Sequence, residues 1–539
     1  MAKLLRVVEL VLVVFLLLGA VTFVLQACHT LTTPGEVEYG EGIVLWQAAN
    51  VTNWTKAFHP VEIYPHVIFH YTPLFHLTSR FVALFTGDLL VAGRLVSILS
   101  LAGTCLIGAL LTASVLPGGR DRFARFVGSV AAGTLVFTSA FWWWETVMRV
   151  DALAIFLSVA GVALFVAARR HRSLGFLAFL FFVAAVYTKQ TSLPAPAACF
   201  ILAFIEKPRY ALQLAAFSVS LGLAILLMLH TATDGLFLRH IVTYNQNPYL
   251  LTGLFDKLQR HARTMAAPLF FATVFPLGFV YSRLYYRPQL VETVVGQFKK
   301  DVSRKGAKAQ RTNPLSLETL RLMLTRSDLE RCVVVVGLYF FFAAILAAAT
   351  ISKLGAYDNY FIEMDVVASL SAGLFLGWLL RRDSFHPQRG HLIIEALVIL
   401  LFFWQAFGNV DALRRAAATC ANPPVDYSPQ VVEFLKTLPD PIYSEDMVVL
   451  MQAGKEVPAE PAIISTLALD GKWDERGFVA RIQRGEFHAI VIRNTLQNDY
   501  RFSKAVQQAI LERYYPTNNI GIFQIYLPKV KTPLNAPGS

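Results

Sequence analysis

Three glutamates lie within six residues near the start of the chain. They belong to residues 34–42 (PGEVEYGEG), directly after the first long apolar run, and are Glu36, Glu38 and Glu41. Crowded carboxylates raise one another's pKa, which prepares one of them as a general base, or they share a cation. The glycines beside Glu41 allow a tight turn. A solvated acidic loop without chemistry explains this segment equally well, so further polar segments decide between the two interpretations.

A second polar segment covers residues 142–151 (WWWETVMRVD), where three tryptophans precede Glu145, Arg149 and Asp151. Glu145 and Arg149 are four residues apart, so they share one face if this segment is helical. An Arg-Asp pair so close to the next apolar run is expensive to place near hydrocarbon. The segment therefore predicts a functional site, and a purely structural ion pair is the alternative.

Two lysines stand beside turn residues at the ends of other apolar runs. Lys189 lies in residues 187–191 (YTKQT), and Lys353 lies in residues 352–360 (SKLGAYDNY). Lysine and arginine neutralise phosphate oxygens as point charges or as a fork. We expect Arg149, Lys189 and Lys353 to converge on one anionic group, although each alone is more typical of an interface anchor.

The elements that must position these side chains are membrane helices. Of the 539 residues, 55% are hydrophobic and 16% are charged, whereas soluble domains carry about 25% charged residues. The net charge of +12 comes from loops between apolar runs, so it indicates membrane orientation and no nucleic-acid partner. We predict an α-helical polytopic membrane protein with about eleven spans. They are residues 4–27, 90–116, 125–142, 148–168, 174–188, 193–206, 210–230, 266–284, 332–350, 361–380 and 391–408.

The positive-inside rule orients these spans. With the N-terminus in the cytoplasm, every arginine- or lysine-rich loop falls inside, and the two acidic segments, Lys189, Lys353 and all residues after 409 fall outside. The basic stretch 297–311 is then a cytoplasmic segment near anionic lipid heads or a solvated charge run.

We expect three parts. Residues 1–410 form the membrane domain, whose first outer loop, 28–89, holds interfacial helices within 43–54 and 73–85. Residues 411–426 are a linker. Residues 427–539 lose the membrane composition and predict a small extracytoplasmic α/β domain. Its helix-like runs are 431–438, 478–484 and 503–513, and its β-like runs are 441–444, 488–493 and 521–526.

The five cysteines contain no C-x-x-C pair and no metal-ligand spacing. Cys28 and Cys420 follow the first and the last span, so the expected topology puts both outside. A disulfide between them would tether the linker to the first helix, but it requires Cα atoms within about 7 Å.

Three short motifs resemble the GT-C superfamily of membrane glycosyltransferases, and most of all family 39-like enzymes such as protein mannosyltransferases and aminoarabinose transferases. The motifs are residues 38–42 (EYGEG), 70–75 (HYTPLF) and 93–97 (GRLVS). Those families open with D-E-x-x-Y-x-E and continue with Y-P-P-L-Y. Gly35 replaces the leading Asp, and Thr72 replaces the first Pro. Glu36 and Glu41 match the two Glu positions and Glu38 belongs to a variant, so matching does not assign the base.

The resemblance implies transfer of one sugar, with inversion, from a polyprenyl-phosphate sugar donor to a glycan, lipid or protein acceptor at the outer face of a bacterial inner membrane. We expect Glu38 or Glu41 to be the base, with Glu36 tested beside them and Glu145 or Asp151 as substitutes. Contacts to sugar or acceptor are expected at Trp46, His70, Tyr71, Asn359 and Tyr360. No cofactor is certain, and a divalent cation stays open. The alternative function is a secondary transporter or flippase of a lipid-linked solute, although the two related halves typical of that class are not evident.

Overall fold

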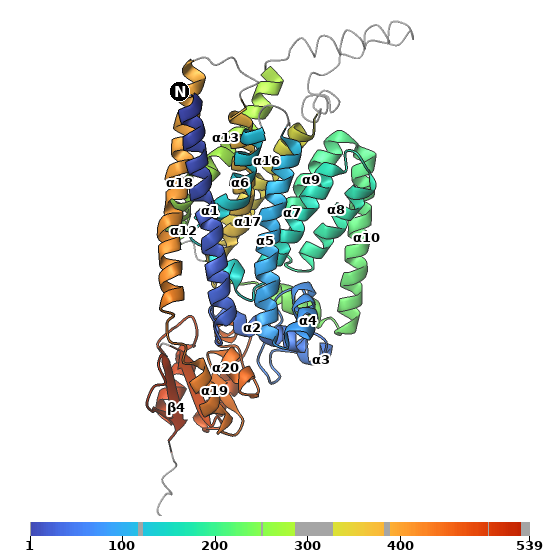
Figure 1. Cartoon of the computed structure of the whole chain (residues 1–539). Coiled ribbons are helices and arrows are strands. Elements are labelled where there is room, and N and C mark those ends of the chain that lie inside the picture. The colour runs from blue at the N-terminus through green and yellow to red at the C-terminus, as the bar shows by residue number, and fades with distance from the viewer. Residues whose placement is uncertain are drawn as a thin grey trace, which may run out of the picture.

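The computed structural model describes residues 2–116, 122–249, 252–285, 327–381, 389–493 and 495–529. Figure 1 shows a long helical bundle with a small α/β unit at one end and the N-terminus at the other. The expected basic segment 297–311 lies outside the described residues. The chain is a mainly helical integral membrane protein with a small sheet near its C-terminal end.

Every expected span contains a helix. Six helices of the described ranges are long and apolar enough to cross a membrane, or seven when the pair α12 and α13, bent by 87°, counts as one span. Three further spans are shorter apolar helices, α7, α8 and α9. The bundle helices are α1 (Ala2–Thr32), α5 (Leu89–Val115), α6 (Arg122–Thr134), α7 (Asp151–Ala167), α8 (Ser173–Val186), α9 (Pro194–Glu206), α10 (Pro208–Ala232), α12 (Leu254–Thr264), α13 (Ala266–Tyr285), α16 (Asp328–Thr350), α17 (Ile362–Leu379) and α18 (Arg389–Ala421).

Short helical turns join the bundle helices, and some of them place the side chains discussed below. They are η1 (Leu135–Thr138), η2 (Trp142–Thr146), α11 (Leu236–Leu238), η3 (Arg239–Thr243) and η4 (Asp358–Phe361).

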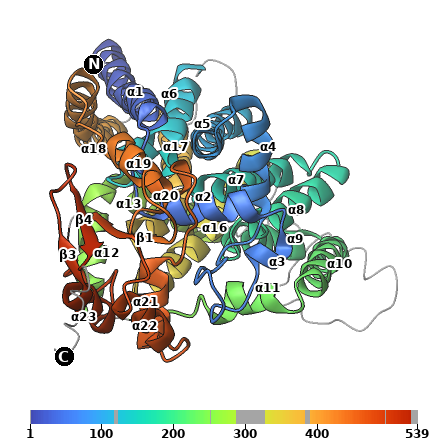
Figure 2. The ribbon, with the colours of Figure 1, turned by 90° about the horizontal axis from the view of Figure 1, so that it is seen from below.

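The first outer loop contains α2 (Gly40–Asn50), α3 (Trp54–Ala57) and α4 (Leu74–Thr86). The expectation of an interfacial helix within 43–54 is wrong, because α2 is buried on every side from Gly40 to Ala48. In Figure 2, helices of the α/β unit lie next to α2, and apolar residues of the unit pack in the same buried cluster as those of α2. By contrast, α4 leaves Leu84 and Phe85 more than three-quarters exposed, as expected of a helix at the membrane surface.

The α/β unit contains a four-stranded sheet in the order β1-β2-β4-β3. β1 and β2 are parallel, and the other two pairs are antiparallel. The three expected β-like runs and the three helix-like runs all form elements of the expected type. The unit contains α19 (Ser428–Lys436), β1 (Ile442–Ser444), α20 (Met447–Gln452), α21 (Pro461–Leu469), α22 (Arg476–Gln483), β2 (Ala489–Arg493), α23 (Lys504–Arg513), β3 (Tyr514–Pro516) and β4 (Phe523–Pro528).

The α/β unit shares one hydrophobic core with α2 of the loop 28–89. Val44 and Trp46 of α2 pack in the same buried cluster as Val431 of α19, Val448 of α20 and Val491 of β2. The helix α18 continues to Ala421, so residues 411–421 of the expected linker are helical. Burial of this apolar surface stabilises the contact between the unit and the loop.

Helices α6 and α17 cross at glycines. Gly373 and Gly377 form a G-x-x-x-G pair on α17, and they face Gly128 of α6. A Cβ at Gly128 would lie 2.7 Å from Cα of Gly377 and 2.8 Å from the carbonyl oxygen of Gly373. Small residues let the two backbones touch, which is a common packing mode between membrane helices.

We expect Gly373→Val to lower the free energy of unfolding by about 1–3 kcal/mol, because the added atoms meet the backbone of α6. Unfolding of the purified protein in detergent measures this change. Gly408→Val in α18 is the control, since a Cβ there meets no atom within 4 Å. Equal losses in both variants would point to helix propensity and contradict the packing argument.

Candidate active site

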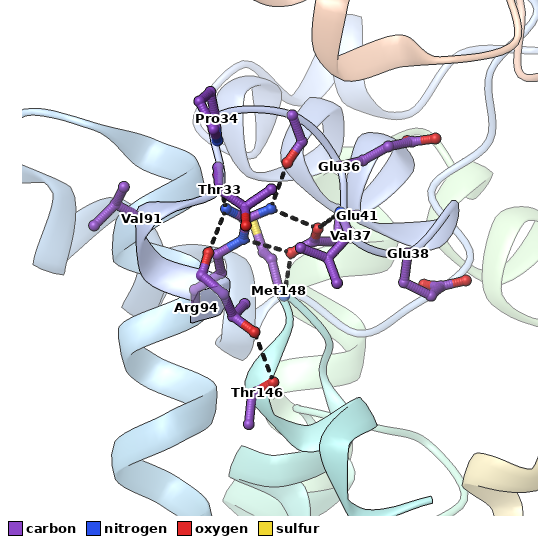
Figure 3. Close-up of polar contacts among 12 residues, drawn as sticks. Thr33, Pro34, Glu36, Val37, Glu38, Glu41, Val91, Arg94, Thr146 and Met148 are labelled. Carbon is purple, nitrogen blue, oxygen red and sulfur yellow. Dashed lines mark hydrogen bonds and ion pairs between the residues drawn. The ribbon is translucent and has the colours of Figure 1, made fainter. Parts of the chain in front are cut away.

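A fully buried ion pair holds the acidic loop, residues 33–42, on the helical bundle. Arg94 of α5 donates to both carboxylate oxygens of Glu41, from Nε at 2.8 Å and from Nη2 at 2.7 Å, and neither side chain is exposed. Nη1 also donates to the carbonyl oxygens of Thr30 and Thr33, and Nη2 to that of Gly35 (Figure 3). The guanidinium thus fixes the backbone on both sides of the first helix end.

Glu41 accepts two further hydrogen bonds, from the backbone N–H of Val37 at 2.7 Å and of Met148 at 2.8 Å. Each carboxylate oxygen therefore accepts one bond from Arg94 and one from the backbone. No lone pair remains for a substrate hydroxyl. This geometry gives Glu41 a structural role, since it joins the acidic loop to the second polar segment.

Packing and hydrogen bonds explain the residue types at three positions of the motif 93–97. A Cβ at Gly93 would overlap the side chain of Met148, so glycine lets the second polar segment approach α5. Arg94 holds Glu41, and the hydroxyl of Ser97 donates to the carbonyl oxygen of Arg149 at 3.1 Å. Arg94 was not among the site residues predicted from the sequence, although a charged side chain inside an apolar run is itself a signal.

Glu38 is the member of the acidic loop whose carboxylate stays accessible, with 12% of its side chain exposed. It accepts the N–H of Gly40 at 2.8 Å and lies 3.4 Å from Nη1 of Arg149. Burial raises the pKa of Glu38, and Arg149 opposes that shift. A Cβ at Gly40 would strike the Arg149 guanidinium, so this glycine leaves the cation room to reach Glu38.

Glu36 points away from Arg94, as Glu38 does (Figure 3), but it faces the α/β unit. Its Oε1 accepts from Nη1 of Arg493, the last residue of β2, at 2.9 Å, and its side chain is 1% exposed. Burial, reinforced by the charge of Asp446 and opposed by Arg493, raises the pKa of Glu36 well above its ordinary value. Glu36 is therefore part of the junction between loop and unit.

Gly35 stands where related motifs carry a leading Asp, and the structure shows why a side chain does not fit there. A Cβ at Gly35 would collide with the side chain of Ser428 in α19. The N–H of Gly35 donates to Asp426 at 2.8 Å. The α/β unit thus takes the space of the missing carboxylate.

The second polar segment is not the helix that spacing predicts. η2 ends at Thr146, residues 147–150 are extended or bent, and α7 begins at Asp151. The expectation of one shared helical face for Glu145 and Arg149 is therefore wrong. The expected Arg149–Asp151 ion pair is also absent from the described residues, because Arg149 turns to Glu38 and Asp151 turns to Lys189.

Arg149 sits among aromatic groups. Its guanidinium lies 5.3 Å from the ring centre of Trp144, and Nη2 lies 3.5 Å from the hydroxyl oxygen of Tyr71. Its side chain is 12% exposed, and its Nε has no hydrogen-bond partner among the described residues. Arg149 therefore holds a largely buried positive charge with one unpartnered N–H donor.

Lys189 and Asp151 form the second charged pair of the site. The ammonium lies 2.5 Å from Oδ1 of Asp151, which also accepts from the amide of Asn359 at 3.3 Å. Nζ lies 5.0 Å from the ring centre of Tyr360. Asp151, Lys189, Asn359, Tyr360 and Glu363 contribute to the walls of a small cavity of about 20 Å³. Asp151, Lys189 and Asn359, although up to 208 residues apart in the chain, therefore meet at one place.

Lys353 does not join this group. Its recorded partner is the ring of Tyr249, whose centre lies 5.8 Å from Nζ, and the two residues form a backbone bridge. Trp46 also lies elsewhere, 3% exposed in the core shared with the α/β unit.

His70 lies beside Tyr71, with 4.0 Å between their ring centres. Its Nδ1 is 3.2 Å from the amide of Gln47, and its carbonyl oxygen accepts from Gln190 at 2.9 Å. Burial, with help from the charge of Arg149, lowers the pKa of His70 to about 3. The imidazole is thus neutral near pH 7 and adds a polar edge without charge.

Glu145 is completely buried, and neither of its carboxylate oxygens has a hydrogen-bond partner among the described residues. Burial, with the charge of Asp151, raises its pKa well above the ordinary value. Because the side chain is completely buried, neither oxygen is accessible to an acceptor hydroxyl in this structure. Within the described ranges, no three His, Cys, Asp or Glu side chains come together as metal ligands.

Cys28 and Cys420 are both free, exposed thiols in this structure, so the hypothetical disulfide is not formed. The Sγ of Cys420 lies 3.7 Å from the carbonyl oxygen of Leu25, one turn before Cys28.

Glu41→Gln should lower the free energy of unfolding by about 3–5 kcal/mol, because Arg94 would stay buried without its counter-charge. Glu38→Gln, the matched variant in the same loop, should cost clearly less than Glu41→Gln, since its ion pair is longer and 12% of each of its side chains is exposed. Unfolding in detergent measures both. If Glu41→Gln were as stable as Glu38→Gln, Glu41 would not be the structural member of the loop.

No protein-family model matches the sequence, and no curated protein matches it. In fold, the chain is similar to ArnT from Cupriavidus metallidurans bound to undecaprenyl phosphate, with a TM-score of 0.54 at 11% identity over 96% of this chain and 98% of that one. It is also similar to the Archaeoglobus fulgidus oligosaccharyltransferase in its apo form, with a TM-score of 0.50 at 10% identity over 98% and 75%. The complex of that enzyme with Zn and sulfate gives 0.50 at 12% identity over 96% and 73%. The chain has the GT-C fold that these two membrane transferases share.

Proposed function

We propose that this protein is a membrane glycosyltransferase that moves a sugar from a polyprenyl-phosphate donor to an acceptor hydroxyl, with inversion at the anomeric carbon. The observation that carries the proposal is the position of Glu38. It is the accessible carboxylate of the acidic loop, and it lies 3.4 Å from the Arg149 guanidinium. A base next to a phosphate-binding cation is what such a reaction requires.

Arg149 and Lys189 are the proposed donor-phosphate ligands. Each is only 12–18% exposed and held by a carboxylate, Glu38 for Arg149 and Asp151 for Lys189. Tyr71 and Tyr360 flank the two cations. The structure of ArnT that shares this fold is bound to undecaprenyl phosphate, which supports a polyprenyl phosphate as the anion here. A phosphate would compete with the carboxylates for these donors.

This competition suggests a sequence of events. When the donor phosphate engages Arg149, Glu38 loses its ion-pair partner and is free to accept a hydrogen bond from the acceptor hydroxyl. Glu38 then takes the hydroxyl proton as the oxygen attacks the anomeric carbon. The bond from that carbon to the phosphate oxygen breaks, and the polyprenyl phosphate leaves with its negative charge balanced by Arg149 and Lys189.

The sugar would lie between the base and the phosphate ligands. His70, Tyr71 and Asn359 supply neutral hydrogen-bonding groups near these charges, and the ring of Tyr360 supplies an apolar face. Lys353 and Trp46 are outside this proposed set because of their positions. We place the acidic loop and the α/β unit at the outer face of a bacterial inner membrane, as the charge pattern predicts.

A divalent cation has a limited place in this proposal. The archaeal oligosaccharyltransferase is known in complex with Zn and sulfate, but the described residues offer no cluster of three ligands. Arg149 and Lys189 already provide positive charge for the leaving phosphate. We therefore assign no step to a metal.

Glu38→Gln should reduce kcat by about two or more orders of magnitude, because the amide cannot accept the hydroxyl proton. Transfer of radiolabelled sugar from a polyprenyl-phosphate donor measures this loss. Glu62→Gln is the control, since Glu62 lies in the same outer loop, is 47% exposed and pairs only with Arg239 among the described residues. Near-normal turnover in Glu38→Gln would remove Glu38 as the base.

The pH dependence follows from the sign of the shift. The base acts in its ionised form, so kcat/KM should fall as the pH drops through the pKa of Glu38. Because burial raises that pKa, the fall should begin at a higher pH than that of an ordinary glutamate, whose pKa is about 4.3. A pH profile in detergent tests this, and an acid limb at or below the ordinary value would contradict the assignment.

Arg149→Lys should weaken donor binding by roughly 10- to 100-fold, because an ammonium cannot reproduce the fork of hydrogen bonds. Binding of polyprenyl phosphate, followed by tryptophan fluorescence or calorimetry, measures the change. Arg239→Lys provides the control, since Arg239 is 43% exposed and pairs with Glu62. Wild-type affinity in Arg149→Lys would end its role as a phosphate ligand.

A further inference from the structure

The acidic loop, residues 33–42, is held from two sides. On the bundle side, Arg94 and Glu41 fix its two ends. On the other side, two arginines of the α/β unit contact its middle. Arg493 binds both the carboxylate and the carbonyl oxygen of Glu36, at 2.9 and 3.1 Å.

The second arginine, Arg501, covers the ring of Tyr39, with its guanidinium carbon 3.2 Å from the ring centre. The Tyr39 hydroxyl donates to Glu460, which also caps the start of α21. Arg501 in turn lies 3.6 Å from Glu445. Burial sets this group apart from ordinary surface pairs, since Glu445 is 6% and Glu460 1% exposed.

Between these contacts lies Glu38, which directly precedes Tyr39 and comes two residues after Glu36. The carboxylate of Glu38 has no recorded ion pair with the α/β unit among the described residues, and its own salt bridge is to Arg149 of the bundle. The N–H of Gly40 and the guanidinium of Arg149 hold this carboxylate directly. The backbone that carries Glu38 is fixed on both sides by the unit, through Glu36 and Tyr39.

We propose that Arg493 and Arg501 are positioning residues, which act through Glu36 and Tyr39 to aim Glu38 at the acceptor. The inference rests on the proposed role of Glu38. It makes the α/β unit a part of the catalytic apparatus. Without the two arginines, Glu38 would still be present, but its carboxylate would no longer be held in the orientation that faces the acceptor. Loss of about 1 Å in the placement of such a group reduces turnover by up to roughly 100-fold.

Other contacts hold the α/β unit in place, so the two arginines can be tested without releasing it. Val44 and Trp46 share its core. The N–H of His66 donates to the carbonyl oxygen of Pro458 at 2.8 Å, and the side chain of Gln452 donates to the carbonyl oxygen of Pro34 at 2.8 Å.

The experiment uses the full-length protein in detergent and compares Arg493→Ala, Arg493→Lys and Arg501→Ala with the wild type. Hydrogen exchange of residues 33–42 reports the order of the loop, and exchange of β2 and β4 reports the seating of the unit. Steady-state kinetics give kcat and the KM values of donor and acceptor. Arg476→Ala is the control, because Arg476 is 90% exposed and pairs with Asp474 within the unit.

We expect each alanine variant to raise exchange in the loop while β2 and β4 stay protected. The value of kcat should fall about 10- to 100-fold with the donor KM within about twofold of the wild type. Arg493→Lys, which keeps the charge, should recover part of both losses, and Arg476→Ala should change neither.

Three results would overturn the inference. Unchanged loop exchange with unchanged kcat would show that the arginines do not order the base. A rise in acceptor KM alone would mean that they touch the acceptor directly. The third result is a rise in the exchange of β2 and β4 in Arg493→Ala that Arg493→Lys reverses, while exchange of the loop stays high. Arg493 would then only attach the unit to the loop and would not order Glu38. Hydrogen exchange of the loop is measured without any substrate. A failure of the positioning role is therefore distinguishable from a failure of Glu38 as the base.

Discussion

The buried pair of Arg94 and Glu41 is the interaction on which the rest of the candidate site depends. Removing two charges from water costs several kcal/mol for each ion, and their attraction offsets this cost only when the remaining donors and acceptors are filled. Here the guanidinium also binds three backbone carbonyl oxygens, and the carboxylate also binds two backbone N–H groups. The pair thus joins three chain segments to α5: the end of α1, the acidic loop and the segment before α7.

All hydrogen-bonding positions of the Glu41 carboxylate are filled in this pair. The three glutamates of the loop, although chemically identical, therefore have different roles. Glu41 has no capacity left, and Glu36 is held at the α/β unit by Arg493. Glu38 keeps an exposed edge and a single, longer ion pair, so it is the carboxylate that can change partners. A site in which two acids are structural and one is accessible explains why the segment is so acidic without requiring three catalytic groups.

The two neighbouring cations, Arg149 and Lys189, are also paired with carboxylates. This pairing limits the cost of holding a positive charge in a mostly buried place. In the proposed function, the donor phosphate replaces these partners with its own negative charge. The α/β unit closes over the same region, and its shared core with α2 means that the loop and the unit fold against each other.

The sequence by itself determined the features that depend on near neighbours along the chain. Apolar runs long enough for a membrane form helices wherever they occur, and all expected spans are helical. The alternation of helix-like and β-like runs after residue 427 likewise predicted the elements of the α/β unit, because each run carries its own periodicity. The concentration of polar residues near 36–41 and 145–151 could be read in the same way.

Only the tertiary structure decided which of these polar residues meet. Glu41 and Arg94 are 53 residues apart, Asp151 and Asn359 are 208 apart, and Glu36 and Arg493 are 457 apart. Spacing suggested that Arg149 would pair with Asp151 and that α2 would lie at an interface, and both expectations were wrong. The physical reason is that a buried charge takes whichever partner the packed helices bring within hydrogen-bond reach, and helix packing is set by surfaces that no local pattern encodes.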